Sequence, residues 1–599
     1  MKKYIYIFSI CILSLIACED DKKSNDTKTE KSTQSFADFL DDYYQKGLEL
    51  NPLNATFAGI NTYNDQFPNF LSDEHHEKLK VHYTTFKNAL ENYADTDLSE
   101  SEQLSKAILN WDCDMNLKQL SFKNDRLLPL NQMWTLNLVV GQLASGASAQ
   151  PFKTVADYNN WLQRLEGYNV WLQTAKERMQ EGIQENYVLP KSLIKKVIPQ
   201  FEVLASNDVE NHLFYSPIKN FPANFSDDDK KQLTTSYTTI LTEKLIPSFD
   251  TIYQFLKGDY LKAGRESSGI SALPHGEAYY NHAIKNYTTT NMTATEIHEL
   301  GLKEVARILA AMEKVKTQVG FTGDIKSFFN FVRENKALMP YTEPKQIIDN
   351  FNAIHDRMKP QLEKLFDLKP KTPFEVRRTE AFREASASAE YNPGSLDGTR
   401  PGIFYTPIPD ATTYNVFSDE ALFLHEAIPG HHYQISLTQE NENLPAFRKT
   451  LWYSAYGEGW ALYTESLGKE LGLYTDPYQY FGMLGMEMHR AIRLVVDTGL
   501  HAKGWTREEA IQYSLDNEAE SEASITSEIE RYMANPGQAL SYKIGQLKIR
   551  ELRAKAEKTL GDTFDIREFH NQVLSTGCIP LQLLEDKINI WIQVKSNTK

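Results

Sequence analysis

The sequence predicts a large, mostly α-helical protein with a small β-sheet beside its candidate site. From about residue 36 the apolar residues recur mostly at helical spacing, and short turns separate long polar-apolar segments. Strand-like runs are few. With 41% hydrophobic and 12% aromatic residues, the 599-residue chain can bury a large core. We therefore expect a globular helical body.

The N-terminus has the pattern of a bacterial lipoprotein signal peptide. Lys2 and Lys3 precede an apolar stretch that ends in a small residue before Cys18. The stretch is shorter than the about 20 apolar residues that span a bilayer. We expect residues 1–17 to be removed and Cys18 to carry a lipid anchor; the alternative is an ordinary signal peptide with a chance cysteine. Residues 18–33 would then be the lipidated cysteine and a flexible, charged tether.

These features predict a protein of the cell envelope, anchored by lipid to the outer membrane on its periplasmic or its surface face. Outside the signal, no run of 18 or more consecutive apolar residues occurs. Cys113 and Cys578 could pair in an oxidising envelope, but at such distant positions we expect buried free thiols, since two cysteines make no disulfide framework. A formal charge of -16 argues against a nucleic-acid partner.

The body of the chain reads as a single helical domain. Residues 34–599 contain no fixed-period repeat and no Pro/Gly/Ser-rich linker. Two lobes, at roughly residues 34–290 and 291–599, are expected within this one domain.

Three helix starts are visible before the candidate site. Residues 97–100 and Ser226 carry N-cap residues ahead of helical patterns. Thr293 and Glu296 form a capping box that opens a helix through about Val319. Helices are therefore expected in both lobes.

The helical pattern breaks between residues 374 and 410. Phe374–Arg378 alternates like a strand, residues 392–400 form a turn-rich loop, and residues 402–405 read as a second short strand. One interpretation is a sheet whose edge pairs with an extended substrate, with Tyr405 as a substrate contact. The other is a structural hairpin that caps a helical bundle.

Residues 425–432, HEAIPGHH, gather one carboxylate and three imidazoles in apolar surroundings. The zinc-hydrolase signature H-E-x-x-H places two histidines one helical turn apart, with a glutamate beside the first. Here the second histidine arrives late. In an unbroken helix, His425 and His432 would lie about 10.5 Å apart along the axis, which is a long reach for two ligands of one ion.

The Pro429-Gly430 pair offers a solution. Proline removes a helical N–H and glycine tolerates unusual dihedrals, so a bulge here would return His431 to the i+4 position. We therefore predict that His425 and His431 bind Zn²⁺, with His432 as the alternative to His431. Glu426 would be the general base that takes a proton from a metal-bound water.

A catalytic zinc site needs a third protein ligand, for which Glu458 is the best candidate. It lies between two glycines at the start of a strongly apolar helix, where a carboxylate is otherwise out of place. Glu465, two turns later on the same face, would orient a ligating histidine.

Four later residues are candidates for contact with substrate. Arg490 or Arg493 would bind a substrate carboxylate through two hydrogen bonds, although salt-bridged helix packing explains most charges of that helix equally well. Near a Pro-Gly turn, Tyr532 or Tyr542 would supply a hydroxyl that stabilises the oxyanion.

Several motifs, in this order, resemble the bacterial lipoprotein family catalogued as domain of unknown function 885: TATEIHELGLKEVARI, HEAIPGHHYQ, GEGWALYTES, RAIRLVVDTGLH and NPGQALSYKIGQ. That family is grouped with the zincin-like peptidases, similar in outline to thimet oligopeptidase and the Taq-type carboxypeptidases. The resemblance implies a large helical zincin-like metallopeptidase body with a central cleft. It matches His425 and Glu426 to the zincin motif, Glu458 to the later ligand, and Tyr542 in preference to Tyr532 to the catalytic tyrosine.

The sequence thus predicts a lipid-anchored zinc metallopeptidase that hydrolyses peptides in the cell envelope. One alternative is a non-catalytic helical surface lipoprotein that binds peptides or glycans. Another is a zinc hydrolase that acts on a different amide.

Overall fold

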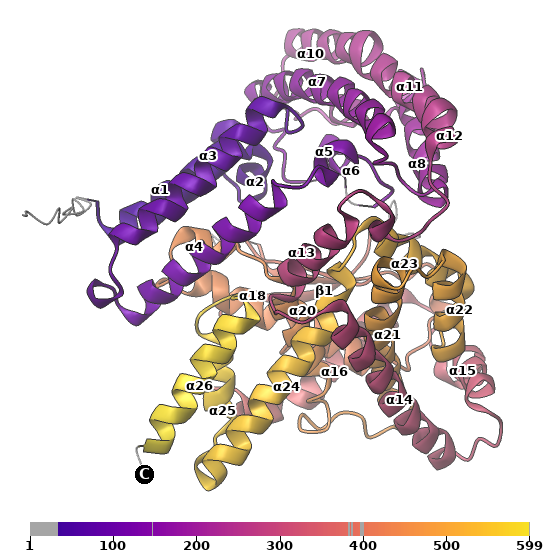
Figure 1. Cartoon of the computed structure of the whole chain (residues 1–599). Coiled ribbons are helices and arrows are strands. Elements are labelled where there is room, and N and C mark those ends of the chain that lie inside the picture. Colours follow the sequence, from indigo (N-terminus) through magenta and orange to yellow (C-terminus); the bar gives the residue numbers. More distant parts are fainter. Residues whose placement is uncertain are drawn as a thin grey trace, which may run out of the picture.

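The structure, a computed structural model, describes residues 34–597 apart from residues 134, 147, 381–383, 385–386 and 396–399. The predicted signal peptide, Cys18 and the tether lie outside the described residues. The described chain is mostly helical with one small sheet, as the sequence predicts (Figure 1).

The helices of the first half are α1 (Phe36–Leu50), α2 (Pro52–Phe57), α3 (Asp73–Ala89), α4 (Glu100–Gln119), α5 (Asn124–Leu127), α6 (Leu136–Ala144), α7 (Val155–Glu185), α8 (Lys191–Leu204), α9 (Ser216–Lys219), α10 (Asp227–Ile240), α11 (Ile246–Phe255), α12 (Leu261–Ala263) and α13 (Gly276–Thr288). Those that follow are α14 (Ala294–Gln318), α15 (Ile325–Glu334), α16 (Pro344–Leu365), α17 (Asp419–Glu426), α18 (His431–Glu440), α19 (Ala446–Thr450), α20 (Ser454–Glu465), α21 (Pro477–Ala502), α22 (Arg507–Asn517), α23 (Glu522–Ala534), α24 (Ser541–Leu560), α25 (Ile566–Leu574) and α26 (Leu581–Asn597).

Two groups of helices occupy opposite ends of the molecule. Figure 1 shows α7, α8, α10, α11 and α12 together at one end, and α14, α16, α24 and α26 toward the other. The first group encloses its own apolar core, built from residues between Leu53 and Tyr260. The larger core combines the C-terminal helices with α1, α3 and α4. The predicted lobe boundary near residue 290 stays a prediction.

The predicted helix starts are confirmed. Ser99, Ser226 and Thr293 are the N-cap residues of α4, α10 and α14, and each side chain accepts a hydrogen bond from the backbone N–H three residues on. At Thr293 the Glu296 carboxylate also accepts from the N-cap backbone N–H, which completes the capping box. Local capping chemistry therefore sets where these helices begin.

The sheet lies where the sequence predicts it, but its pairing differs. Strands β1 (Phe374–Arg378) and β3 (Gly402–Thr406) pair in parallel, and β2 (Glu390–Asn392), which the sequence analysis missed, joins β3 antiparallel. The strand order is β1-β3-β2. The two predicted strands therefore do not form a hairpin with each other, and β3 is the central strand rather than an edge.

The helices around the candidate site pack unusually closely. A Cβ on Gly545 of α24 would lie 1.8 Å from the Ala455 carbonyl oxygen of α20, and one on Gly459 would lie 2.5 Å from the Gly545 Cα. Only glycine fits at such contacts, so α20 and α24 touch backbone to backbone. This contact fixes the helix that carries Glu458 against the one that carries Tyr542.

Two further expectations concern the cysteines and the membrane. Cys113 and Cys578 are buried free thiols, as predicted. Within the described residues, no helix combines the length and the apolar character needed to cross a bilayer.

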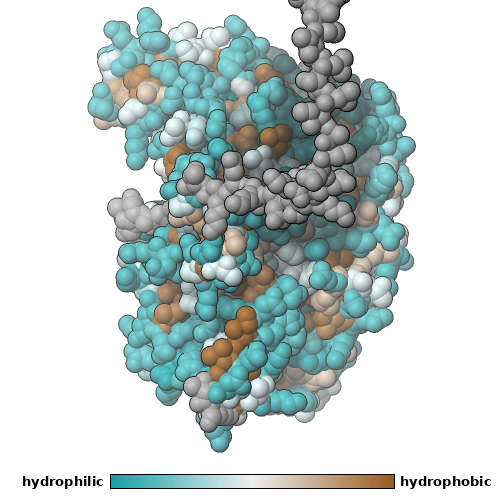
Figure 2. Space-filling model, turned by 60° about the vertical axis from the view of Figure 1, so that its left-hand side comes forward, coloured by the Kyte–Doolittle hydropathy of each residue, from teal (hydrophilic) through white to brown (hydrophobic). Residues whose placement is uncertain are grey.

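On the face shown in Figure 2, hydrophilic residues predominate and hydrophobic ones lie in small separate groups.

Candidate metal centre

The histidine segment forms two helices rather than the single bulged helix that we expected. Helix α17 ends at Glu426 and α18 begins at His431, with a cis peptide bond between Ile428 and Pro429. The chain folds back so tightly that a Cβ on Gly430 would lie 1.9 Å from the His425 carbonyl oxygen. The predicted bulge is therefore wrong, because the helix stops and restarts.

Helix α20 stabilises this break through side chains. Trp460 donates its indole N–H to the Pro429 carbonyl (2.8 Å), and Thr464 donates its hydroxyl to the Leu424 carbonyl (2.8 Å). Both carbonyls belong to the interrupted helical region, where backbone acceptors need outside partners. The helix that carries Glu458 thus also holds the two histidine helices together.

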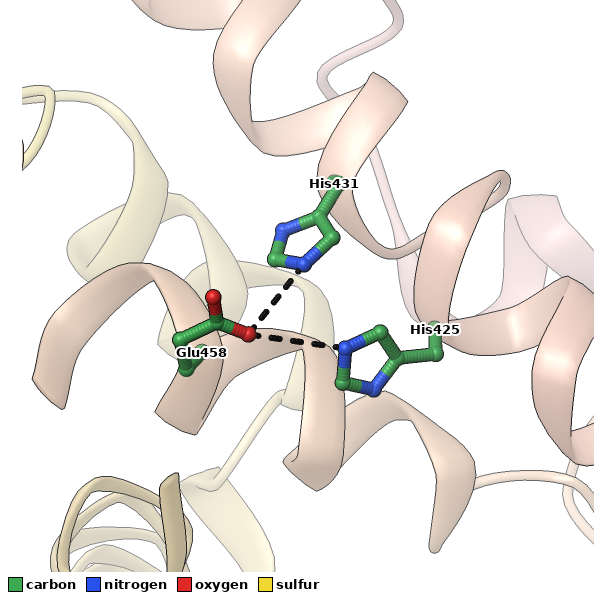
Figure 3. A group of neighbouring side chains, drawn as sticks. All are labelled: His425, His431 and Glu458. Atoms are coloured by element: carbon green, nitrogen blue, oxygen red, sulfur yellow. Dashed lines mark ion pairs between the residues drawn. The ribbon is translucent and has the colours of Figure 1, made fainter. Parts of the chain in front are cut away.

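His425, His431 and Glu458 converge into one cluster, here called the metal group (Figure 3). The Glu458 Oε2 atom lies 3.5 Å from His425 Nε2 and 3.3 Å from His431 Nε2. One ligand atom from each of the three residues lies within 4.8 Å of the others. Two ligands about 2.05 Å from a tetrahedral zinc are about 3.3 Å apart, so these spacings fit a shared ion.

Glu465 fixes the orientation of the His425 ring. Its Oε1 atom lies 2.7 Å from His425 Nδ1, which donates the hydrogen bond to the buried carboxylate. With the proton on Nδ1, Nε2 presents its lone pair to the cluster, as a metal ligand must. The Nδ1 atom of His431 is buried and has no partner among the described residues. The donor set of two imidazoles and one carboxylate therefore suits zinc.

The electrostatics of the metal group depend on its own members. Although burial lowers the pKa of His425, the hydrogen bonds that its ring donates to Glu458 and Glu465 raise it to about 9. Burial likewise favours protonated Glu458, but the charges of the two histidines hold its pKa well below the usual range. Among the described residues, no Lys or Arg pairs with Glu458. Within the described part of the chain, the groups that pair with Glu458 are therefore both imidazoles.

Glu426 lies beside the metal group with its carboxylate unengaged. The side chain is buried, and it makes no hydrogen bond or ion pair within the described part of the chain. Burial raises the pKa of Glu426, and the charges of His425 and His431 oppose that rise. A buried carboxyl group whose pKa is raised and which has no hydrogen-bond partner in the described chain suits proton transfer.

Arg490 and Arg493, on one face of α21, differ in their engagement. Arg493 donates to the Tyr532 hydroxyl (3.0 Å) and to Glu528 (2.9 Å). Arg490 makes one long contact, from Nη1 to the Met486 carbonyl (3.4 Å), and its Nε is buried without a partner among the described residues. Its charge is one of those that lower the pKa of Glu426. Arg493 Nη1 is also buried without a partner among the described residues, so each arginine keeps a spare donor, and Arg490 is the less engaged of the two.

The two candidate tyrosines have different partners, and the Tyr542 hydroxyl has a hydrogen bond with the Gln538 side chain. The Tyr532 hydroxyl donates to Glu528 (2.7 Å) and accepts from Arg493, so it is occupied. Tyr542 lies beneath the Arg493 guanidinium, 4.5 Å from the ring centroid. Burial and then the charge of Glu458 raise the pKa of Tyr542, which keeps its hydroxyl protonated as a hydrogen-bond donor near the metal group.

The residues around Arg493 form a second polar cluster, here called the arginine network. Glu528 accepts hydrogen bonds from Arg493, Arg531 and Tyr532, and His489 pairs with both Glu518 (2.6 Å) and Glu528 (3.4 Å). Every carboxylate of the network thus has nitrogen donors around it.

His432 and Tyr405 lie on the sheet side of the site. His432 Nδ1 lies 3.0 Å from the Tyr391 hydroxyl, and its ring packs against Phe374 with centroids 5.0 Å apart. Burial lowers the pKa of His432 to about 4. His432 is not in the metal group, since its ring faces the sheet. Tyr405 belongs to the central strand β3 and is half-buried.

Residues 52–588 match the family described as bacterial proteins of unknown function, DUF885. The chain belongs to this family. A protein named as a putative lipoprotein from Colwellia psychrerythraea has a similar crystal structure, with 28% identity, a TM-score of 0.85, and coverage of 94% of this chain and 99% of that one. A putative lipoprotein of unknown function from Shewanella oneidensis shares the fold, with 19% identity, a TM-score of 0.73, and coverage of 92% and 99%. No curated protein matches the chain.

One residue beside the metal group of this DUF885 chain escaped the sequence analysis. The Trp452 ring lies 5.8 Å from the His431 ring and is 45% exposed. The sequence does hint at such a neighbour, because Gly457, immediately before Glu458, has no side chain and leaves room for a ring to pack there.

Proposed function

We propose that this chain is a zinc-dependent peptidase of the cell envelope that hydrolyses peptides with Glu426 as general base. The observation that carries the proposal is the metal group, in which His425, His431 and Glu458 bring three ligand atoms within 4.8 Å of one another. The described chain offers no second such group. Two imidazoles and a carboxylate leave one position of a tetrahedral ion open, as a catalytic site requires.

Zinc bound here would polarise the peptide carbonyl and make water a stronger nucleophile. The chain supplies the rest. Glu426 accepts a proton as water adds to the carbonyl carbon, and returns it to the amide nitrogen as the C–N bond breaks, so that a carboxylic acid and an amine leave. Its carboxyl group is buried and has no hydrogen-bond partner among the described residues, which suits both transfers.

Two further side chains complete the reaction scheme. The Tyr542 hydroxyl would donate to the carbonyl oxygen as negative charge develops there. Tyr532 takes no part in this scheme, because its hydroxyl is already bonded to Glu528. Arg490 would bind a carboxylate of the substrate through its spare donors.

The wider context of the proposal is a zincin-like fold with a cleft leading to the metal group. His425, His431 and Glu458 are only 3–16% exposed, so a peptide needs such an opening to reach them. The envelope location rests on the signal-like N-terminus and on two similar proteins that are named as putative lipoproteins. A lipid anchor on Cys18 belongs to the same proposal.

The test is cleavage of a mixed peptide library by the purified protein, followed by mass spectrometry. Glu426→Gln should lower the cleavage rate by about 100- to 10,000-fold, the usual contribution of a general base, while the fold and the zinc content persist. Exposed Glu442 provides the matched control, since Glu442→Gln should cleave like the wild type. Unchanged cleavage by Glu426→Gln would exclude this base.

The same assay separates the alternatives. A wild-type protein that binds peptides without cleaving them would be a binding lipoprotein. One that binds zinc and hydrolyses other amides, but no peptide, would be a hydrolase of another class.

A further inference from the structure

The metal group becomes more open to solvent from His425 toward Glu458. The exposed fraction of the side chain is 3% for His425, 10% for His431 and 16% for Glu458. Trp452, at 45%, lies next to the more exposed pair. The Trp452 ring therefore lies on the more exposed side of the metal group.

Trp452 is held against both helices that supply the outer ligands. Its ring lies 5.8 Å from the ring of His431, at the start of α18. A Cβ on Gly457 of α20 would meet the Trp452 ring at 2.1 Å, so the indole lies directly on the backbone that precedes Glu458. The ring is thus fixed in place, although almost half of the residue faces solvent.

An exposed tryptophan is costly unless something covers it. Indole offers a large, flat apolar surface, and aromatic side chains that pack on it gain affinity beyond the area they bury. Ligand sites combine such apolar walls with a few polar groups that act on the ligand. Here the polar groups are the metal group, Glu426 and Tyr542.

We propose that Trp452 forms the apolar wall of a substrate subsite beside the metal group, and that the preferred peptides carry an aromatic or large aliphatic residue next to the bond that is cleaved. This inference rests on the proposed peptidase function and adds a substrate class to it. Trp452 contacts the substrate side chain and takes no part in proton transfer.

The experiment compares wild type, Trp452→Ala and Trp452→Phe on two matched peptide series, which differ only in having Phe or Ala on either side of the scissile bond. Trp452→Ala should lower kcat/KM for the Phe peptide by about tenfold or more, the range that one apolar contact surface provides, and change it less than about twofold for the Ala peptide. Trp452→Phe should keep most of the preference for the Phe peptide over the Ala peptide. Phe57→Ala, which removes a 50% exposed aromatic ring elsewhere, should behave like the wild type.

A direct binding measurement accompanies the kinetics. In the Glu426→Gln background, the Phe peptide should change the indole fluorescence, and the change should be lost when Trp452 is also replaced by Phe. Zinc content reports whether each variant keeps the metal group; if Trp452→Ala loses zinc, the comparison rests on Trp452→Phe and Trp452→Leu.

Active wild-type protein whose Trp452 variants show the same residue preference would overturn this inference and leave the peptidase function standing. A wild-type protein that cleaves no peptide would overturn both.

Discussion

The metal group and the arginine network both contain histidines and buried glutamates, and they differ in what satisfies the carboxylates. In the arginine network, Glu528 accepts hydrogen bonds from two guanidinium groups and a tyrosine hydroxyl. In the metal group, Glu458 meets only two imidazole nitrogens, with no Lys or Arg partner in the described chain. A buried carboxylate needs compensating positive charge. The network contains its own, whereas in the function proposed here the metal group would obtain it from a bound zinc ion.

The difference also explains the proton balance of the two clusters. Burial raises the pKa of Glu528, but the surrounding charges and hydrogen bonds outweigh burial and hold this pKa far below the usual range. Burial lowers the pKa of His489, but the charge of Glu518 outweighs burial and raises it. The network therefore favours the charged forms of both Glu528 and His489. In the metal group, the histidines must lose their protons to bind zinc, which makes zinc and protons competitors there.

The largest expected effect breaks the arginine network. Glu528→Gln leaves Arg493 and Arg531 without their shared counter-charge, which should lower the free energy of unfolding by about 3 kcal/mol. Zinc content should stay unchanged, because Glu528 is outside the metal group. Urea unfolding and metal analysis of the same preparation check both statements. Loss of zinc from this variant would mean that the two clusters are not independent.

The second effect concerns the turn that brings the two histidine helices together. Gly430→Ala places a Cβ 1.9 Å from the His425 carbonyl, so α17 and α18 must separate. We expect a loss of about 1–3 kcal/mol in stability together with loss of zinc binding. Gly485→Ala is the matched control, since a Cβ there meets nothing within 4 Å and lies in the interior of α21. It should stabilise the protein by up to about 1 kcal/mol. Zinc retained by Gly430→Ala would contradict the importance of the turn.

The sequence predicted the members of the metal group but not the backbone that joins them. The spacing of His425, His431 and Glu458 indicated which residues could meet. That α17 stops and α18 restarts was hidden, because Pro and Gly are equally consistent with a bulge and with a break. The close contact of Gly430 with His425 is a tertiary feature that no local pattern encodes.

The pairing of the sheet is likewise a tertiary feature that local sequence patterns do not encode. Helix starts at Ser99, Ser226 and Thr293 were predictable, because capping involves residues three positions apart. Strand β2 is only three residues long, which is too short to show an alternating pattern. Strands β1 and β3 pair in parallel, and alternation along one strand does not reveal the direction of its partner.

The third effect concerns the support of His425. Glu465→Gln keeps the shape of the side chain but weakens the hydrogen bond that fixes the His425 ring. Replacing such a partner of a ligating histidine typically weakens metal binding by about 10- to 100-fold, and we expect the same here. Competition for zinc with a fluorescent chelator measures the change. Equal affinity in variant and wild type would show that Glu465 has no orienting role.

The smallest effect is a pH dependence that comes from buried histidines outside both clusters. His501 accepts from the Ile270 N–H and donates to the Tyr532 carbonyl, and His570 contacts the Leu365 carbonyl and the Tyr463 hydroxyl. Burial lowers the pKa of both histidines to about 3, from an ordinary 6.5. Below pH 6.5 the unfolded chain therefore binds more protons than the folded one, and stability falls as the pH drops toward 3.

His570→Gln tests this dependence. Between about pH 5.5 and 4, the free energy of unfolding of the variant should fall less steeply with decreasing pH than that of the wild type. The slopes should differ by about 1.4 kcal/mol per pH unit, which corresponds to one proton fewer taken up on unfolding. An unchanged slope in urea unfolding at several pH values would show that His570 is not the group that titrates.

The central claim is that the metal group binds one zinc ion through His425, His431 and Glu458, and zinc titration of the metal-stripped protein tests it most directly. The wild type should take up close to one zinc per chain, and Glu458→Gln should bind it at least about 100-fold more weakly, while Glu518→Gln, in the arginine network, should bind like the wild type. A wild-type protein that takes up no zinc, or a Glu458→Gln variant that binds it equally well, would contradict the account.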